Sequence, residues 1–529
     1  MNKSVTNKIK AKRKDSEGRR NSPGAQIEAI SRGSGKLRPG KCGSEILLPE
    51  FSLFNRWRMF LKGLFPDGNR GEIRYDYRPL LPPITRDIVG VNRRKETLSN
   101  LRVFVANLSL GLIFLLALAG CRHKAERDYI EYWSSSNVFE IEFARKIVAE
   151  WNSDSTHREV RLQPVPEGQS SEEIVLAAIV GKTTPDIYSN TWPGAIEQYR
   201  DAGVILAFNR FPDFMGYLRE RLPDKLEEQF RSSDGQFYQF PWKGNPVLMA
   251  YNKALLNDYL NSDLPHTYRQ FYQIGEKLRQ RLKERGGKQI WMLDPNITPI
   301  WWQRFFDFYP FYVSATQGKT FITPGKKVLL DIPESRRVFQ FFRQGYETGL
   351  MPISLFKEDI FLMNRLVFHL TGPWSIPHYK KFAPEGFEWG YTSIPVPEEG
   401  MLPYTYGDAK NIIIFSDTKY PEDCWEFIKF MTSRQNDLLL MRVTQQLPLR
   451  KDLLRDTLFT DFFTEYPDMR IFAEHIPYIV GLDQSLYLQE IFDMISKTWD
   501  EIVIYRAKDI ETGLADLNHQ VQVQVNREK

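Results

Sequence analysis

The sequence predicts an α/β fold in which helices flank mainly parallel sheets. From residue 128 onward, short segments rich in β-branched and aromatic residues alternate with longer segments whose apolar residues recur every three or four positions. Parallel strands need a crossover of a dozen or more residues, and the helical segments between the strands supply it. The alternation of strand and helix therefore indicates the α/β class.

The first strand and the first helix have the clearest patterns. The segment RDYIEYWSSSN is typical of a strand that ends in small polar residues. The next segment, NVFEIEFARKIVAEWN, predicts a helix with Asn137 as its N-cap and Glu140 at the capping-box position. The apolar stripe of this helix consists of residues spaced by four: Phe139, Phe143, Ile147 and Trp151.

A second strand, a helix and a third strand follow directly. EVRLQPVP is typical of a strand, SEEIVLAAIVGK of a helix, and TPDIYSN of a short strand. Together with the first pair they predict a βαβαβ start. Ligands of such sheets bind at the loops that follow the carboxyl ends of the strands. Residues 134–137 and 189–194 are the loops in this position.

Strands and helices continue to the end of the chain. DGQFYQFPWKGNPVLMAYNKALLND predicts a turn, a short strand, a Pro-containing loop and an apolar strand. LPHTYRQFYQIGEKLRQRL predicts a helix capped by Thr267. FLMNRLVFHLTGPWSIPHY predicts a helix followed by a strand, YPEDCWEFIKFMTSRQNDLLLM predicts a helix, and a helical region closes the chain.

The first part of the chain differs from the remainder in charge and composition. The chain holds 71 Lys and Arg against 66 Asp and Glu, and the basic excess lies in residues 1–100. This part is polar and has no sustained apolar periodicity. We therefore expect residues 1–92 to be either a disordered extension or the product of a reading frame whose start is placed too far upstream. The basic block KIKAKRK is expected to belong to a solvated tail, and contact with nucleic acid or anionic lipid is the alternative.

Residues 93–120 have the layout of a lipoprotein signal peptide. The basic lead RRKETLSNLR precedes an apolar run at 103–119, and LAGC at 118–121 matches a lipobox. We expect lipidation of the Cys121 thiol. A plain transmembrane helix with a chance cysteine and a buried core helix are the alternatives, and the run is barely long enough to span a bilayer. Because the basic lead stays cytoplasmic, the protein is predicted to be lipid-anchored to the cell membrane and to face the extracytoplasmic side.

Cysteine and histidine usage predicts a protein that is not an enzyme and that needs no cofactor or metal. The three cysteines are Cys42, Cys121 and Cys424, so lipidation of Cys121 leaves the outward part with one thiol and no disulfide. The sequence contains no GxSxG, HExxH, paired CxxC or GxxxxGK[ST] motif, and its seven histidines lack metal-ligand spacing. A carboxylate pair of a glycoside hydrolase leaves no motif and stays an open alternative.

Nine segments between residues 128 and 520 occur in a familiar order: the strand and helix at 132–151, then GKTTPDIY, YRDAGVILAF, DGQFYQFP with YNKALL, LPHTYRQF, TGPW, YGDAKNIIIF, CWEFIKFM and LPLRKDL. Their order and spacing behind a lipobox resemble the family 1 extracellular solute-binding proteins of ABC importers, the group that includes maltose-binding protein. The aromatic-rich segment IWWQRFFDFYPFYV and the N-terminal extension depart from this pattern.

The resemblance implies the two-lobed periplasmic-binding-protein fold, in which two α/β lobes close about a hinge. It also implies that the protein binds a carbohydrate between the lobes and delivers it to the permease subunits of an ABC transporter. The implied segments are 128–246 plus 408–445 for lobe one, 253–403 plus 450–529 for lobe two, and crossings near Ala250–Asn252, Tyr404–Gly407 and Gln446–Pro448.

Ligand-binding side chains are expected among the tryptophans that follow strands, because the apolar face of a sugar ring stacks on an aromatic plane. The tryptophans that qualify by position are Trp192, Trp242, Trp301, Trp302 and Trp374. For each of them the alternative is a core position. The resemblance favours a ligand role for Trp374 and for the pair at 301–302, where the family holds stacking aromatics. Trp133 and Trp425 lie inside regular elements and are predicted to be core residues.

Three polar residues complete the predicted site. Asn137 ends the first loop and Asn245 lies in a lobe crossing, and the resemblance implies ligand-facing polar groups at both places. Asp408 follows Gly407 at the second crossing, and its alternative role is that of a turn or cap residue. Other protein classes stay open: a binding protein for iron or another non-sugar solute, a surface adhesin without lobe crossings, and a surface glycoside hydrolase.

Overall fold

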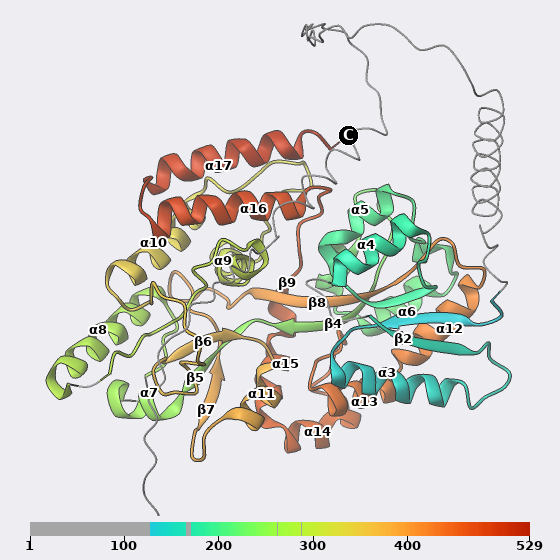
Figure 1. Ribbon diagram of the computed structural model, residues 1–529, viewed down its shortest axis with the longest axis horizontal. Helices are drawn as coiled ribbons and strands as arrows, with labels where there is room; N and C mark the ends of the chain where they lie inside the picture. The colour runs from blue at the N-terminus through green and yellow to red at the C-terminus, as the bar shows by residue number, and fades with distance from the viewer. Residues whose placement is uncertain (1–126, 166–170, 262, 287, 529) are drawn as a thin grey trace, which may run out of the picture. The chain divides into compact units, whose positions relative to one another are not determined.

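The computed structural model describes residues 127–165, 171–261, 263–286 and 288–528, all of which belong to one structural unit (Figure 1). The predicted extension at 1–92, the predicted signal peptide at 93–120 and its lipidation site Cys121 lie outside the described residues. Within the described ranges, no helix is both long and apolar enough to cross a membrane.

The first of two sheets contains the βαβαβ start that the sequence predicts. Its strand order is β2-β1-β3-β8-β4, and β9 lies beside β8 (Figure 1). β1 pairs in parallel with β2 and β3, whereas β8 is antiparallel to both β3 and β4. The strands are β1 Ile130–Ser134, β2 Val160–Pro164, β3 Ile187–Thr191, β4 Phe240–Pro246, β8 Thr405–Ile414 and β9 Ile479–Val480.

The second sheet has the strand order β6-β5-β7 and is antiparallel. Its strands are β5 Leu248–Asn252, β6 Phe368–Thr371 and β7 Trp389–Thr392. The prediction of mainly parallel sheets is therefore wrong: parallel pairing among the described strands joins only β1 to β2, β1 to β3 and β8 to β9. β8 lies between β3 and β4 and is antiparallel to both. It is not joined to β4 by a single crossover helix, because the chain between the two strands forms the whole second sheet and several helices.

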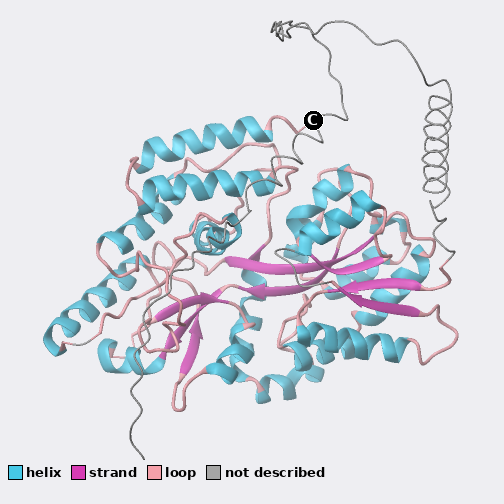
Figure 2. Cartoon of the chain, in the orientation of Figure 1, coloured by secondary structure: helices cyan, strands magenta, loops and turns pink. Residues whose placement is uncertain are grey.

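Helices cover both sheets (Figure 2). Around the first sheet lie α3 Val138–Trp151, α4 Ser171–Gly181, α5 Ile196–Asp201, α6 Phe214–Arg221, α12 Pro421–Met431 and α13 Arg434–Thr444. The remaining helices are α7 Lys253–Leu260, α8 Tyr268–Arg285, α9 Trp301–Ala315, α10 Pro333–Glu347, α11 Ser375–Phe382, α14 Thr460–Glu465, α15 Pro467–His475, α16 Leu488–Trp499 and α17 Ile510–Val525.

The predicted helix caps at Asn137 and Thr267 are confirmed. Asn137 Oδ1 accepts hydrogen bonds from the backbone N–H groups of Phe139 (2.9 Å) and Glu140 (3.2 Å), which satisfies two donors at the start of α3. Thr267 and Gln270 form a reciprocal capping box at α8. Glu140 does not reach back in this way; its carboxylate is buried and pairs with Lys243 instead.

Three apolar clusters form the core. The largest covers one face of the first sheet with side chains of α3, α6, α12 and α13, and it continues to β5, β7 and α11 of the second sheet. A smaller cluster on the other face of the first sheet contains side chains of α4 and α5. The third surrounds α9, where Phe305, Phe308 and Tyr309 are buried among α10, α16 and α17. Trp133 and Trp425 are buried, so their predicted core role is confirmed. Phe462 of α14 and Phe472 of α15 join the largest cluster.

Candidate functional site

The chain passes from the first sheet to the second at Val247, the single residue between β4 and β5. The backbone N–H of Val247 donates to the carbonyl oxygen of Tyr406 on β8 (2.9 Å), so β8 runs beside this passage. The loops after β3 and β6 and the start of α9 carry half-exposed aromatic side chains, and ring contacts link several of them to Tyr406. This is the place where residues of both sheets meet.

Five aromatic residues form what we call the aromatic cluster: Trp192, Trp301, Phe306, Trp374 and Tyr406. The ring centroids of Trp192 and Trp301 are 5.3 Å apart, those of Phe306 and Tyr406 are 5.8 Å apart, and those of Phe306 and Trp374 are 6.1 Å apart. Trp374 is 38% exposed, and Trp192, Trp301 and Phe306 are half-buried. The cluster therefore offers aromatic surface to a ligand.

Two glycines let the loop tryptophans lie close to the backbone. Trp192 begins the sequence Trp-Pro-Gly after β3, and Trp374 ends the sequence Gly-Pro-Trp after β6. A Cβ atom added at Gly194 would lie 2.3 Å from the Trp192 ring, and one at Gly372 would lie 2.1 Å from the Trp374 ring. Any side chain at either glycine would displace the neighbouring indole, so these loops require glycine to hold their tryptophans in place.

Charged groups adjoin the aromatic cluster on β8. Tyr406, Asp408 and Lys410 alternate along the strand, and alternate residues share one face of a sheet. Tyr406 donates to Asp408 Oδ1 (3.3 Å), and Lys410 Nζ lies 3.4 Å from the same oxygen. Burial raises the pKa of Tyr406 well above its usual value, so the phenol keeps its proton. Burial opposes the charge on Lys410, but the carboxylates of Asp408 and Glu172 outweigh it and raise the pKa.

The structure brings together four of the predicted site residues. Trp192 contacts Trp301, and Trp374 is linked to Asp408 through Phe306 and Tyr406. Trp192, Trp301 and Phe306 all pack against the apolar cluster that contains Tyr406. Trp302 is 49% exposed near the start of α9. Asn137 is exposed at the start of α3, where its oxygen serves as the cap. Each of these six predicted side chains either has surface that a ligand can reach or contacts another side chain with such surface.

The predicted ligand roles of Trp242 and Asn245 are not supported by their surroundings. All of β4 is buried; Trp242 is 1% exposed and packs against Phe143. Asn245 is 2% exposed, its amide N–H donates to Gln446 Oε1 (3.3 Å), and its amide oxygen accepts from the backbone N–H of Leu447 (3.2 Å). Both side chains are engaged inside the protein and offer no free face to a ligand.

Sequence reasoning missed Phe306, Tyr406 and Lys410. Phe306 lies five residues after Trp301 on the same helix, and the aromatic-rich segment at 301–312 hid it among core residues. Tyr406 and Lys410 follow the period-two pattern of β8 on either side of Asp408, which was recognised alone. That alternation is the signal that could have found them.

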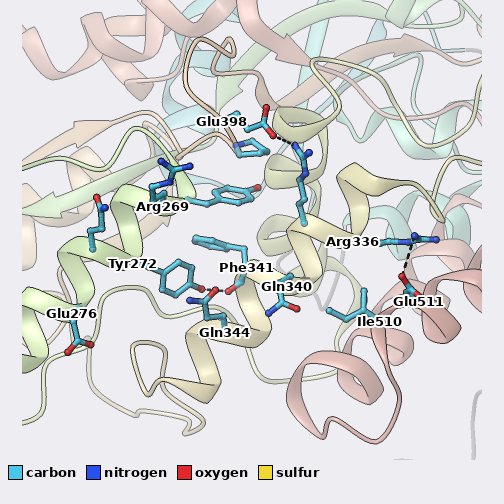
Figure 3. A pocket seen from close by; sticks show the side chains of 14 residues that line it. Arg269, Tyr272, Glu276, Arg336, Gln340, Phe341, Gln344, Glu398, Ile510 and Glu511 are labelled. Carbon is cyan, nitrogen blue, oxygen red and sulfur yellow. Dashed lines mark hydrogen bonds and ion pairs between the residues drawn. The ribbon is translucent and has the colours of Figure 1, made fainter.

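A large surface groove of the described residues lies elsewhere. It has a volume of about 870 Å³, lies on the outer side of α8 and α10 and contains none of the predicted site residues (Figure 3). Tyr272 and Phe341 line it, and Arg337 pairs across it with Glu398 at 2.7 Å. Arg336 pairs with Glu511 at 3.6 Å. Because two arginines and two glutamates of its rim are already paired with one another, this groove is a weaker candidate site than the aromatic cluster.

The described residues offer neither a cluster of metal ligands nor a reactive thiol. The described residues contain no group of three or more His, Cys, Asp or Glu side chains that could hold a metal ion. Cys424 of α12 is buried and unpaired, and its burial raises the pKa of the thiol, so the sulfur stays protonated and inert.

Comparisons with known proteins agree with this architecture. Residues 146–471 match the family model described as bacterial extracellular solute-binding protein. Curated relatives from Brucella abortus and Brucella suis, named as binding proteins, are 20% identical over 271 residues, which is 50% of this chain; the match spans 62% of their length.

Solved structures share the fold at low sequence identity. An uncharacterised protein of Listeria monocytogenes EGD-e is 23% identical with a TM-score of 0.67, and covers 75% of this chain and 100% of its own. The sugar-binding protein MalE of Xanthomonas citri is 16% identical with a TM-score of 0.63, and covers 75% and 98%. These likenesses confirm the predicted two-lobed α/β fold. The family match covers more than half of the sequence, and this chain belongs to the bacterial extracellular solute-binding protein family.

Proposed function

We propose that this protein is the substrate-binding component of an ABC importer, that it binds a carbohydrate at the aromatic cluster, and that it passes the sugar unchanged to a membrane permease. The observation that carries the proposal is the meeting of half-exposed Trp192, Trp301 and Trp374 beside the charged pair of Asp408 and Lys410. Stacked rings provide affinity for the C–H faces of a sugar, and the charged pair provides partners for its hydroxyl groups.

The aromatic cluster draws on both predicted lobes, which are 128–246 plus 408–445 and 253–403 plus 450–529. Trp192 and Trp301 come from different lobes, and so do Asp408 and Trp374. A ligand held by all four would gain its full set of contacts only when the lobes close. This difference in contacts is what allows a ligand to shift an open–closed equilibrium.

A thermal-shift screen tests the ligand class directly. The panel should contain maltose, maltotriose, other oligosaccharides, monosaccharides, a glycerophosphodiester and ferric citrate. We expect one or more sugars to raise the melting temperature in proportion to the logarithm of concentration, as mass action requires. Stabilisation by the glycerophosphodiester or by iron alone would replace the carbohydrate proposal with a different solute. Chromatography of the best ligand after incubation should recover it intact, because we expect no turnover.

The substitution Trp374→Ala is expected to weaken sugar binding by about ten- to a hundred-fold, as the loss of a buried aromatic face of about 1–3 kcal/mol implies. The fold should tolerate this change, because the side chain is partly exposed at the start of α11. Titration calorimetry with the best sugar of the panel measures the effect. Phe382→Ala, at the other end of the same helix and also exposed, is the matched control and should bind normally. Equal affinities in the two variants would contradict the placement of the site.

The proposed anchor is a lipid on Cys121, which the lipobox predicts. Two acyl chains hold a protein stably at a bilayer, whereas one does so only weakly. Mass spectrometry of the membrane fraction should therefore find an acylated peptide that begins at Cys121. Cys121→Ala should release the protein from that fraction, and Cys42→Ala should not. An unmodified Cys121 peptide in membrane-bound protein would refute the anchor.

A further inference from the structure

A buried polar network joins the loop after β1 to the place where the chain passes between the sheets. It consists of Glu140, Lys243, Asn245 and Gln446, and we call it the Glu140 network. Lys243 Nζ lies 2.8 Å from Glu140 Oε1, and Gln446 Nε2 donates to the same oxygen at 2.7 Å. Asn245 Nδ2 donates in turn to Gln446 Oε1 at 3.3 Å. Four side chains from three distant segments are thus linked in one chain of contacts.

The Glu140 network contains an ion pair although it lies inside the protein. Burial lowers the pKa of the Lys243 ammonium, and the Glu140 carboxylate opposes this shift. All four side chains are buried, and Lys243 has no exposed surface. Burial alone would raise the pKa of Glu140, but the Lys243 ammonium and the hydrogen bonds from Gln446 and Ser135 lower it below its usual value. A buried ion pair stabilises a fold poorly compared with apolar residues of the same size. Its presence here therefore calls for a role other than stability alone.

Glu140, Asn245 and Gln446 lie in the three regions that the Glu140 network connects. Glu140 is the third residue of α3 and lies directly behind the loop at 135–137, and Asn137 of that loop is a predicted ligand residue. Asn245 lies two residues before Val247, where the chain leaves the first sheet. Gln446 follows α13 and begins a segment that runs beside β4, since Gly244 N–H donates to the carbonyl oxygen of Leu447 (3.0 Å).

We propose that Glu140 is a positioning residue that couples occupation of the loop at 135–137 to movement of the chain at the passage between the two sheets, through Lys243 and Gln446. The proposal rests on the proposed function in so far as the loop contacts the solute. A displacement of the start of α3 would move the Glu140 carboxylate, and that carboxylate holds both β4 and the segment at 446–449. The Glu140 network is then a two-state element whose arrangement both regions bias.

Hydrogen–deuterium exchange of the full-length protein, without ligand, tests the coupling. Gln446→Leu removes the link from the 446–449 segment and leaves a side chain of similar size. We expect the amides of residues 135–141 to exchange about three- to thirty-fold faster in this variant, which is the usual range for residues that modulate coupling. Amides of α10 and α16 should exchange as in the wild type. Gln445→Asn, at the neighbouring residue, is the matched control and should leave residues 135–141 unchanged.

A second arm of the experiment adds maltotriose. In the wild type we expect protection at 135–141 and at 445–450 together, and in Gln446→Leu protection at 135–141 only. Unchanged exchange at 135–141 in ligand-free Gln446→Leu, or faster exchange throughout the molecule, would overturn the coupling and leave a purely structural role. Absence of any protection in the wild type would instead count against a maltotriose ligand, and the ligand-free arm would still decide the role of Glu140.

Discussion

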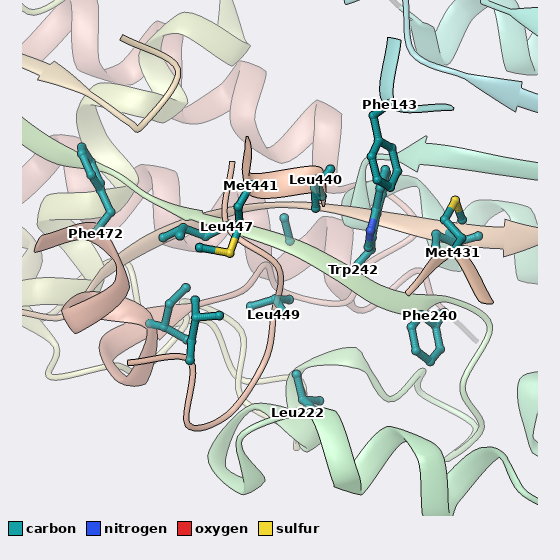
Figure 4. Packing of buried hydrophobic residues seen from close by; sticks show 14 of the residues in the cluster. Phe143, Leu222, Phe240, Trp242, Met431, Leu440, Met441, Leu447, Leu449 and Phe472 are labelled. Atoms are coloured by element: carbon teal, nitrogen blue, oxygen red, sulfur yellow. The ribbon is translucent and has the colours of Figure 1, made fainter. Parts of the chain in front are cut away.

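Trp242→Ala is expected to lower the free energy of unfolding by about 3–5 kcal/mol, as truncation of a fully buried tryptophan typically does. The indole lies in the middle of β4, beside Phe143 of α3 at a centroid distance of 6.0 Å (Figure 4). Its ring also faces the Lys243 ammonium at 4.4 Å. The cavity left by alanine would remove these contacts and open the core around an ammonium that has no exposed surface. Urea unfolding followed by circular dichroism measures the loss.

The same variant separates a core role from a ligand role. At temperatures where Trp242→Ala remains folded, its affinity for the best sugar should stay close to that of the wild type. Trp374→Ala is the counterpart and should show the reverse, with weaker binding and a smaller change in stability. If Trp242→Ala unfolded like the wild type but lost sugar binding, the burial of β4 would not describe the functional state, and the original prediction from the sequence would stand.

The elements that the sequence predicts well are those with local causes. α3 and α8 follow from a capping side chain and an apolar stripe, and both signals lie within a few residues of the helix that they define. Even there, Phe139 of the predicted stripe is exposed, because the stripe reaches the core only from Phe143 onward. The local pattern gives the helix but not the position at which its neighbours begin to cover it.

β4 illustrates what local reasoning cannot reach. Its sequence FPWKGNP contains Lys, Gly, Asn and two Pro, which are typical of a loop, and it led to a ligand role for Trp242 and Asn245. The strand is buried because β8 pairs along it and residues 447–449 bond to it from the other side. These partners lie more than 150 residues away in the sequence. The residues of β4 themselves contain no pattern that indicates this pairing.

The sequence predicts only part of the aromatic cluster, because only some of its members carry a local signal. Trp192 and Trp374 follow strands directly, and the strand-end rule for α/β sheets places such residues near a ligand. Lys410 and Phe306 were missed because their roles depend on which face of a strand or helix meets the passage between the sheets. Residue type and spacing limit the candidates, but only the pairing of distant strands selects among them.

Asp437→Ala is expected to lower the free energy of unfolding by about 3–5 kcal/mol, because it removes the carboxylate that pairs with two buried guanidinium groups. Asp437 Oδ2 lies 2.6 Å from Arg221 Nη1 and 2.7 Å from Arg450 Nε. All three side chains are buried, so neither arginine can recover its lost partner from bulk water. Urea unfolding of the two proteins measures the difference in stability.

Glu142→Ala is the control for the loss of Asp437, since Glu142 pairs with Lys146 on the exposed surface of α3. An exposed pair one turn apart contributes about 0.3–0.5 kcal/mol, so this variant should unfold almost like the wild type. A similar small loss for Asp437→Ala would mean that water reaches the two arginines and that they are not held in the interior.

Arg450 lies four residues after Gln446, so the expected loss would also free the far end of the segment that Glu140 holds. Faster hydrogen exchange at 446–450 in Asp437→Ala should therefore accompany its lower stability.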